Sequence, residues 1–203
     1  MAAVGMGLPR ATFTDAGKYG PHLLAPTASD LRKYNQTDTI LAGFHTDLNF
    51  LTIHAASRYP GLHIWARNTG KRIPVAVPRG TLLVQAGKQL EHLTGGHVRA
   101  GFHEVVVNNR TVEVRTVPDR ELHAPPVSFV LAAEIPSRIN HFSSSQTIER
   151  RKVESPDRPL IRISSTFFWH LSSDYDLTPI PSIQEPDAQE RYPHMKVGEQ
   201  VQK

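Results

Sequence analysis

The amino-acid sequence predicts a mainly β fold in which short strands form a sandwich or barrel. Between residues 39 and 107, runs rich in β-branched and aromatic residues alternate with closely spaced turn signals, a pattern typical of such folds. Another strand-like run, LIRISSTFFWHL, follows at residues 160–171. Helix signals are few and fall at residues 8–19 and 147–154, so we expect only a few short peripheral helices.

Turn signals separate the expected strands in the first half of the chain. Residues 68–70 (NTG) and 78–80 (PRG) are typical turns, and the glycine pair at 95 and 96 interrupts the chain before the next apolar run. The expected strands cover residues 39–55, 62–67, 73–77, 81–87 and 98–107.

The chain has 203 residues, which suits one principal domain. Residues 114–146 contain four prolines and follow no period of 2 or 3.6, so we expect a poorly packed insertion there. Its edges could be encoded by splice-site sequences, which leaves open whether it is a translated intron or an evolved surface insertion. The expected division is a partial N-terminal helix and first strand (1–38), the β core (39–113 and 147–181), this insertion, and a peripheral C-terminal tail (182–203).

The composition of the chain excludes several classes of protein and of metal site. The hydrophobic content is 39%, and no apolar run reaches the roughly 20 residues that a membrane helix needs. The chain has no cysteine, which excludes disulfides, iron–sulfur clusters and thiolate zinc sites and favours a cytoplasmic protein. Basic residues are scattered apart from a triplet at 150–152, which is interpreted as a solvated helix face. We therefore expect a small-molecule substrate and neither nucleic acid nor membrane as partner, while the oligomeric state stays open.

A histidine and an aspartate stand two residues apart in GFHTDLNFLTI at residues 43–53. On a strand, His45 and Asp47 would share one face, which fits either two surface polar residues or part of a metal site. His103, on a later predicted strand, is the candidate third ligand. Two histidines and one carboxylate form the facial triad of non-haem Fe(II) sites. Other histidines are interpreted as core-edge or surface residues: His54, His63, His92, His97 and His170.

A second pair lies on the predicted strand at 160–171. Arg162 and Ser164 would share one face, where a guanidinium and a hydroxyl can hold the same carboxylate. The alternative is an arginine on a solvated strand face. The aromatic residues at 167–169 favour a buried strand and therefore the carboxylate site.

Taken in order, His45-x-Asp47, His103 and Arg162-x-Ser164 resemble the isopenicillin N synthase-like Fe(II)/2-oxoglutarate-dependent dioxygenases. The resemblance covers about residues 40–107 and 159–170 and corresponds to the C-terminal catalytic part of that family. Three features depart from the family. HLLAPT at residues 22–27 lacks the usual Asn-x-Tyr, and Gly-Lys and Leu-Glu at 87–88 and 90–91 replace the usual Gly-Asp and Leu-Gln. The long N-terminal helical region is also absent, so we expect a fragment or a short gene model.

The resemblance implies a double-stranded β-helix (jelly roll, cupin-like) and a mononuclear iron oxygenase. It implies that His45, Asp47 and His103 bind Fe(II), that Arg162 and Ser164 hold the distal carboxylate of 2-oxoglutarate, and that O₂ takes a remaining position. No catalytic residue beyond the metal ligands is expected. The implied reaction converts 2-oxoglutarate to succinate and CO₂ while a small organic substrate is oxidised. Two alternatives stay open: an Fe(II) oxidase that does not use 2-oxoglutarate, and a truncated, non-catalytic metal-binding β-helix module.

Overall fold

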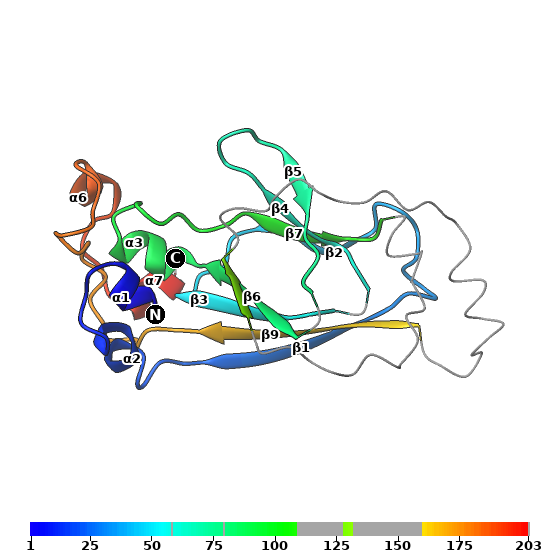
Figure 1. The fold of residues 1–203 in the computed structure, drawn as a ribbon, viewed down its shortest axis with the longest axis horizontal. Coiled ribbons are helices and arrows are strands. Elements are labelled where there is room, and N and C mark those ends of the chain that lie inside the picture. Colours follow the sequence, from blue (N-terminus) through cyan, green and yellow to red (C-terminus); the bar gives the residue numbers. More distant parts are fainter. Residues whose placement is uncertain (58, 79, 109–127, 132–159, 203) are drawn as a thin grey trace.

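The computed structural model describes residues 1–57, 59–78, 80–108, 128–131 and 160–202, which form two β-sheets with short helices at one end (Figure 1). The larger sheet contains, in spatial order, β1 (Leu23–Asp30), β9 (Ile161–Trp169), β3 (Leu51–Ala55), β6 (Thr81–Ala86) and β8 (Ser128–Leu131). The smaller sheet contains β2 (Ile40–His45), β7 (His103–Val106), β4 (Leu62–Trp65) and β5 (Arg72–Pro74). The predicted mainly β jelly roll is confirmed.

Strand β9 occupies an inner position in the larger sheet, although it lies late in the sequence. It pairs antiparallel with β1 from Leu23↔Phe168 to Asp30↔Ile161, and on its other side with β3 from Leu51↔Trp169 to His54↔Thr166. Figure 1 shows β1 and β9 running side by side along the length of the molecule. Because β9 is paired on both edges, side chains on its inner face are held between two neighbouring strands.

Two apolar clusters lie at opposite ends of β9. One surrounds its C-terminal end, where the helices gather, and includes Phe13, Phe50, Leu90, Leu171 and Val197. The other lies by its N-terminal end and consists of Leu31, Tyr59, Val107 and Leu160. Burial of such side chains contributes about 1.5–3 kcal/mol each. The clusters therefore close both ends of the sandwich and leave its middle available for a site.

The helices differ from the prediction in position. Residues 8–19 form no continuous helix; instead α1 covers Ala2–Gly5 and α2 covers Thr12–Ala16. Pro9 separates them, and a proline disfavours the helical conformation of the residue before it. The structure also contains α3 (Lys88–Leu93), which sequence reasoning missed because six residues are too few to show a helical period. No helix in the described part of the chain is long and apolar enough to span a bilayer.

The C-terminal tail is less peripheral than expected. It contains α6 (Ala188–Arg191) and α7 (Val197–Gln202), and Ala188 and Val197 are each 1% exposed. Val197 belongs to the larger apolar cluster, which a polar composition does not reveal. Of the expected insertion at 114–146, the structure describes only β8, which pairs parallel with β6. The remainder of that segment and the expected helix at 147–154 lie outside the described residues.

Candidate metal centre

The two histidines of the predicted triad lie side by side on neighbouring strands of the smaller sheet. His45 ends β2 and His103 begins β7, and the two are paired in register. Their ring centroids are 4.3 Å apart. Asp47 lies beyond the end of β2, in the loop that leads to β3, so the expectation that it shares a strand with His45 is wrong. The strand ends early because the pairing of β2 with β7 is irregular and reaches its last rung at His45.

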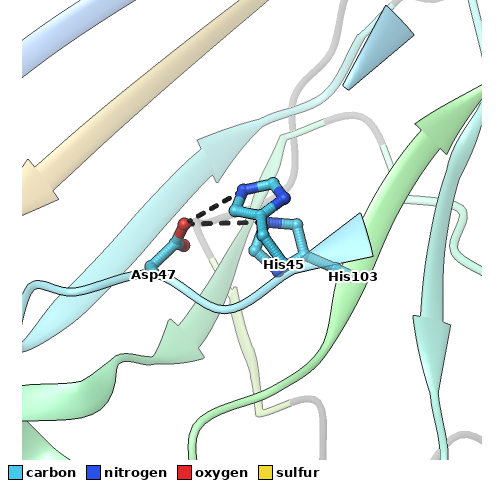
Figure 2. A group of neighbouring side chains, drawn as sticks. All are labelled: His45, Asp47 and His103. Carbon is cyan, nitrogen blue, oxygen red and sulfur yellow. Dashed lines mark ion pairs between the residues drawn. The ribbon is translucent and has the colours of Figure 1, made fainter. Parts of the chain in front are cut away.

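The loop nevertheless turns Asp47 toward both rings (Figure 2). Asp47 Oδ1 lies 3.5 Å from His45 Nε2 and 3.7 Å from His103 Nε2. All three ligand atoms lie within 4.8 Å of one another. Metal–ligand bonds of about 2.1 Å at right angles place neighbouring ligand atoms about 3 Å apart. The observed spacings are therefore close to those of a shared ion.

Hydrogen bonds fix the orientation of each candidate ligand. His45 Nδ1 lies 2.6 Å from the Gly43 carbonyl oxygen, and His103 Nδ1 lies 3.2 Å from that of Gly101. Because a carbonyl can only accept, each Nδ1 carries a proton, and Nε2 is the nitrogen that each ring turns toward Asp47. Asp47 Oδ2 accepts a 2.6 Å hydrogen bond from the hydroxyl of Thr52. Oδ1 is thereby left for an ion.

The surroundings of His103 favour neutral imidazole, the form that binds metal. Burial lowers the pKa of His103, and the nearby Asp47 carboxylate only partly offsets that effect. The Asp47 and His103 side chains are 6% and 5% exposed, whereas that of His45 is 46% exposed. The group is therefore closed on one side and open on the His45 side. The donor set of two imidazoles and one carboxylate fits Fe(II) and leaves positions for reactants.

The second predicted pair lies in the same cavity. A cavity of about 410 Å³ between the two sheets is lined by the three candidate ligands and by Arg162 and Ser164. Arg162 is only 6% exposed, and its Nε has no hydrogen-bond partner among the described residues. Burial lowers the pKa of its guanidinium, and no charge of a described residue offsets that effect. The cavity thus holds a buried positive charge as well as a metal-binding group.

Gly61 allows the chain to pass close to Arg162. Its φ of +146° is a conformation that other residues rarely adopt. A Cβ at this position would lie 2.9 Å from the carbonyl oxygen of Val106 and 3.7 Å from Arg162 Nε. Gly61 therefore shapes the wall behind the guanidinium.

Sequence reasoning missed a row of buried polar residues on the inner face of the larger sheet. His54 was interpreted as a core-edge or surface residue, but it lines the cavity and is 9% exposed. Thr52, Gln85 and Thr166 are also buried. Polar residues at alternate positions of apolar strands, as in Thr52-x-His54, were the signal that could have identified them.

Solved structures share this fold. A 2OG-Fe(II) oxygenase family protein from Caulobacter crescentus aligns with a TM-score of 0.64 at 22% identity, over 98% of this chain and 50% of that one. A full-length Neurospora crassa protein, solved in complex with alpha-KG, aligns with a TM-score of 0.63 at 17% identity, over 98% and 48%. The dioxygenase for auxin oxidation from rice aligns with a TM-score of 0.62 at 15% identity, over 98% and 50%. The chain therefore spans about half the length of these proteins.

Family membership follows from the sequence itself. No curated protein matches the chain closely. The sequence profile of the 2OG-Fe(II) oxygenase superfamily matches residues 16–117, which include all three candidate metal ligands and slightly more than half of the chain. Together with the jelly roll and the His–Asp–His cluster, this match shows that the chain belongs to the 2OG-Fe(II) oxygenase superfamily.

Proposed function

We propose that this protein is an Fe(II)/2-oxoglutarate-dependent oxygenase that oxidises a small organic substrate. In this proposal His45, Asp47 and His103 bind Fe(II), and Arg162 and Ser164 bind the distal carboxylate of 2-oxoglutarate. The observation that carries it is the joint presence, in one cavity, of a facial-triad donor set and a buried guanidinium whose Nε lacks a partner among the described residues.

Each side chain contributes a separate task. Bound Fe(II) supplies the redox chemistry with O₂ that protein side chains lack. The Nε2 atoms of His45 and His103 and Oδ1 of Asp47 hold the ion, and the Asp47 charge partly neutralises it. Thr52 keeps the carboxylate turned so that Oδ1 faces the ion. The open side at His45 leaves room for reactants to approach.

Arg162 selects an anion. Burial of a charge costs several kcal/mol, and Arg162 Nε has no hydrogen-bond partner among the described residues, so a carboxylate that pairs with the guanidinium would offset part of that cost. The planar guanidinium can bind both oxygens of a carboxylate, and Ser164, two residues along the same face of β9, adds a hydroxyl donor. A diacid can satisfy both ends of the cavity, with one acid group at the metal centre and the other at Arg162 and Ser164.

Solved neighbours support the class of substrate. The Neurospora crassa protein was solved with alpha-KG and thymine and with alpha-KG and 5-formyluracil, and JOX2 was solved with 2OG, Fe and JA. By analogy we propose a small organic substrate for this chain, and from its lack of cysteine we propose a cytoplasmic location. Cell fractionation tests the location, and substrate screening by O₂ consumption tests the class.

Anaerobic titration tests the proposal. Addition of Fe(II) and then 2-oxoglutarate should produce the weak visible charge-transfer band of the ternary complex, and later exposure to O₂ should yield succinate. Iron binding with turnover but without that band or succinate would indicate an oxidase that uses Arg162 for a substrate carboxylate. Iron binding with no O₂-dependent turnover would indicate a non-catalytic module.

A further inference from the structure

His54 lies on the cavity wall between the candidate metal ligands and Arg162. Strands β3 and β9 are paired, and their residue pair Thr52↔Phe168 lies next to Asp47. The next pair along the strands whose side chains face the cavity is His54↔Thr166. Arg162 lies four residues from Thr166 on the same inner face of β9, about 13 Å along the strand at roughly 3.3 Å per residue. The His54 ring also lies 6.2 Å from the ring of His103, centroid to centroid.

Two side chains fix the His54 ring. Its Nε2 lies 2.6 Å from Gln85 Oε1, and its Nδ1 lies 3.2 Å from Thr166 Oγ1. The Gln85 carbonyl oxygen accepts from Nε2–H, and the Thr166 hydroxyl donates to Nδ1. Both ring nitrogens are therefore engaged within the protein. The ring offers a ligand its face and edge, and it has no nitrogen left for an ion.

This placement constrains any ligand that spans the cavity. A diacid held at the metal end by one acid group and at Arg162 by the other must cross the His54 ring. A ring that cannot turn sets how far the connecting chain can bend toward the sheet. A longer chain with both ends held must bend more and would meet the ring.

We propose that His54, held by Gln85 and Thr166, is a specificity-determining residue that sets the chain length of the dicarboxylate accepted between the metal centre and Arg162. This inference rests on the proposed function, because it requires a diacid to bridge the two ends. In this role the bulk of the His54 ring excludes a dicarboxylate that is one methylene longer.

Anaerobic calorimetric titration of the Fe(II)-loaded protein with 2-oxoglutarate and with 2-oxoadipate tests the proposal. One methylene in a fitted pocket is worth about 10- to 200-fold, so the wild type should prefer 2-oxoglutarate by at least about tenfold. His54→Ala should bring this ratio close to one by weakening 2-oxoglutarate binding and admitting 2-oxoadipate. Iron affinity should change little. Thr166→Val keeps the His54 ring but removes the hydrogen bond from Thr166 to its Nδ1. This substitution should lower the ratio by less than His54→Ala does.

His63→Ala is the matched control. His63 is another buried ring, 6% exposed, but it does not line the cavity. Its loss should lower stability and leave the ratio unchanged. If His54→Ala does not fold, Thr166→Val and Gln85→Met provide the same test. An unchanged ratio in the folded variants, or a wild type without preference, would overturn the inference and leave the proposed function intact. A wild type that binds neither diacid would overturn the proposed function itself.

Discussion

The hydroxyl of Thr52 illustrates how much of this site depends on residues that contact no reactant. It is fully buried and donates to Asp47 Oδ2 at 2.6 Å, with a longer contact to Asn49 Oδ1. Without it, the carboxylate would lose the partner that directs Oδ1 toward the histidines. Loss of such a supporting hydrogen bond typically weakens metal binding about 10- to 100-fold.

We therefore predict that Thr52→Val, which keeps the side-chain shape, lowers Fe(II) affinity by roughly 10- to 100-fold. Competition with a chelator under anaerobic conditions measures the change. Thr81→Val is the control, because the Thr81 hydroxyl donates to the Pro78 carbonyl at an exposed position. Equal effects of the two substitutions would exclude a specific role for Thr52.

Arg162→Ala should separate the two halves of the site. The guanidinium has no role in binding a metal cation, but a charge-assisted hydrogen bond to a carboxylate is worth about 1.5–3 kcal/mol. Affinity for 2-oxoglutarate should therefore fall by at least about tenfold while Fe(II) affinity changes little. Sequential calorimetric titrations measure both. If both affinities fall by the same factor, the substitution has damaged the fold and the carboxylate assignment loses its support.

At the scale of elements, the strands were the most predictable part because each carries its own pattern. The expected strand at 81–87 corresponds closely to β6, and the run at 160–171 contains β9. The end of β2 at His45 could not be anticipated, since it depends on how β2 pairs with β7. The insertion of β9 between β1 and β3 is likewise a long-range pairing that no local pattern records.

The candidate site also depends on long-range contacts that the local sequence pattern does not record. His45, His103 and Asp47 were identified from spacing and residue type, and the structure brings them together although Asp47 lies off the strand. From the sequence alone, His54 is predicted to be a core-edge or surface residue. Its neighbours Gln85 and Thr166 come from two other strands, so their convergence is visible only in three dimensions.

The loop that precedes β4 carries a prediction of its own. Gly61→Ala would place a Cβ 2.9 Å from the Val106 carbonyl oxygen at a φ of +146°. Strain of this kind costs about 1–3 kcal/mol, so the free energy of unfolding should fall by that amount. Denaturant titration measures it. Gly43→Ala, with no atom within 4 Å of the new Cβ, should have a much smaller effect, and a similar loss there would contradict the argument.

At the scale of the whole molecule, buried histidines link stability to pH. Burial is the largest cause of a lowered pKa for His54, His63 and His103, each relative to an ordinary value of 6.5. Between the lowered pKa and 6.5 the unfolded chain binds more protons than the folded one, so protonation favours unfolding in that window.

The metal-free protein should therefore keep its full stability above about pH 6.5. It should lose stability as the pH falls below that value toward the lowered pKa values of these histidines. Denaturant titrations at several pH values measure the slope. His63→Phe, which removes one of these groups away from the cavity, should make the slope shallower. Stability that does not change between about pH 7 and about pH 5 would contradict this account.

In the proposed function, one cavity holds iron at the His–Asp–His end and a diacid at Arg162. The most direct test is an anaerobic crystal structure of the protein with Fe(II) and 2-oxoglutarate. We predict an ion about 2.0–2.2 Å from His45 Nε2, Asp47 Oδ1 and His103 Nε2, with the distal carboxylate paired with Arg162 and Ser164. An ion held by other residues, or a 2-oxoglutarate molecule whose distal carboxylate lies away from Arg162, would contradict the claim.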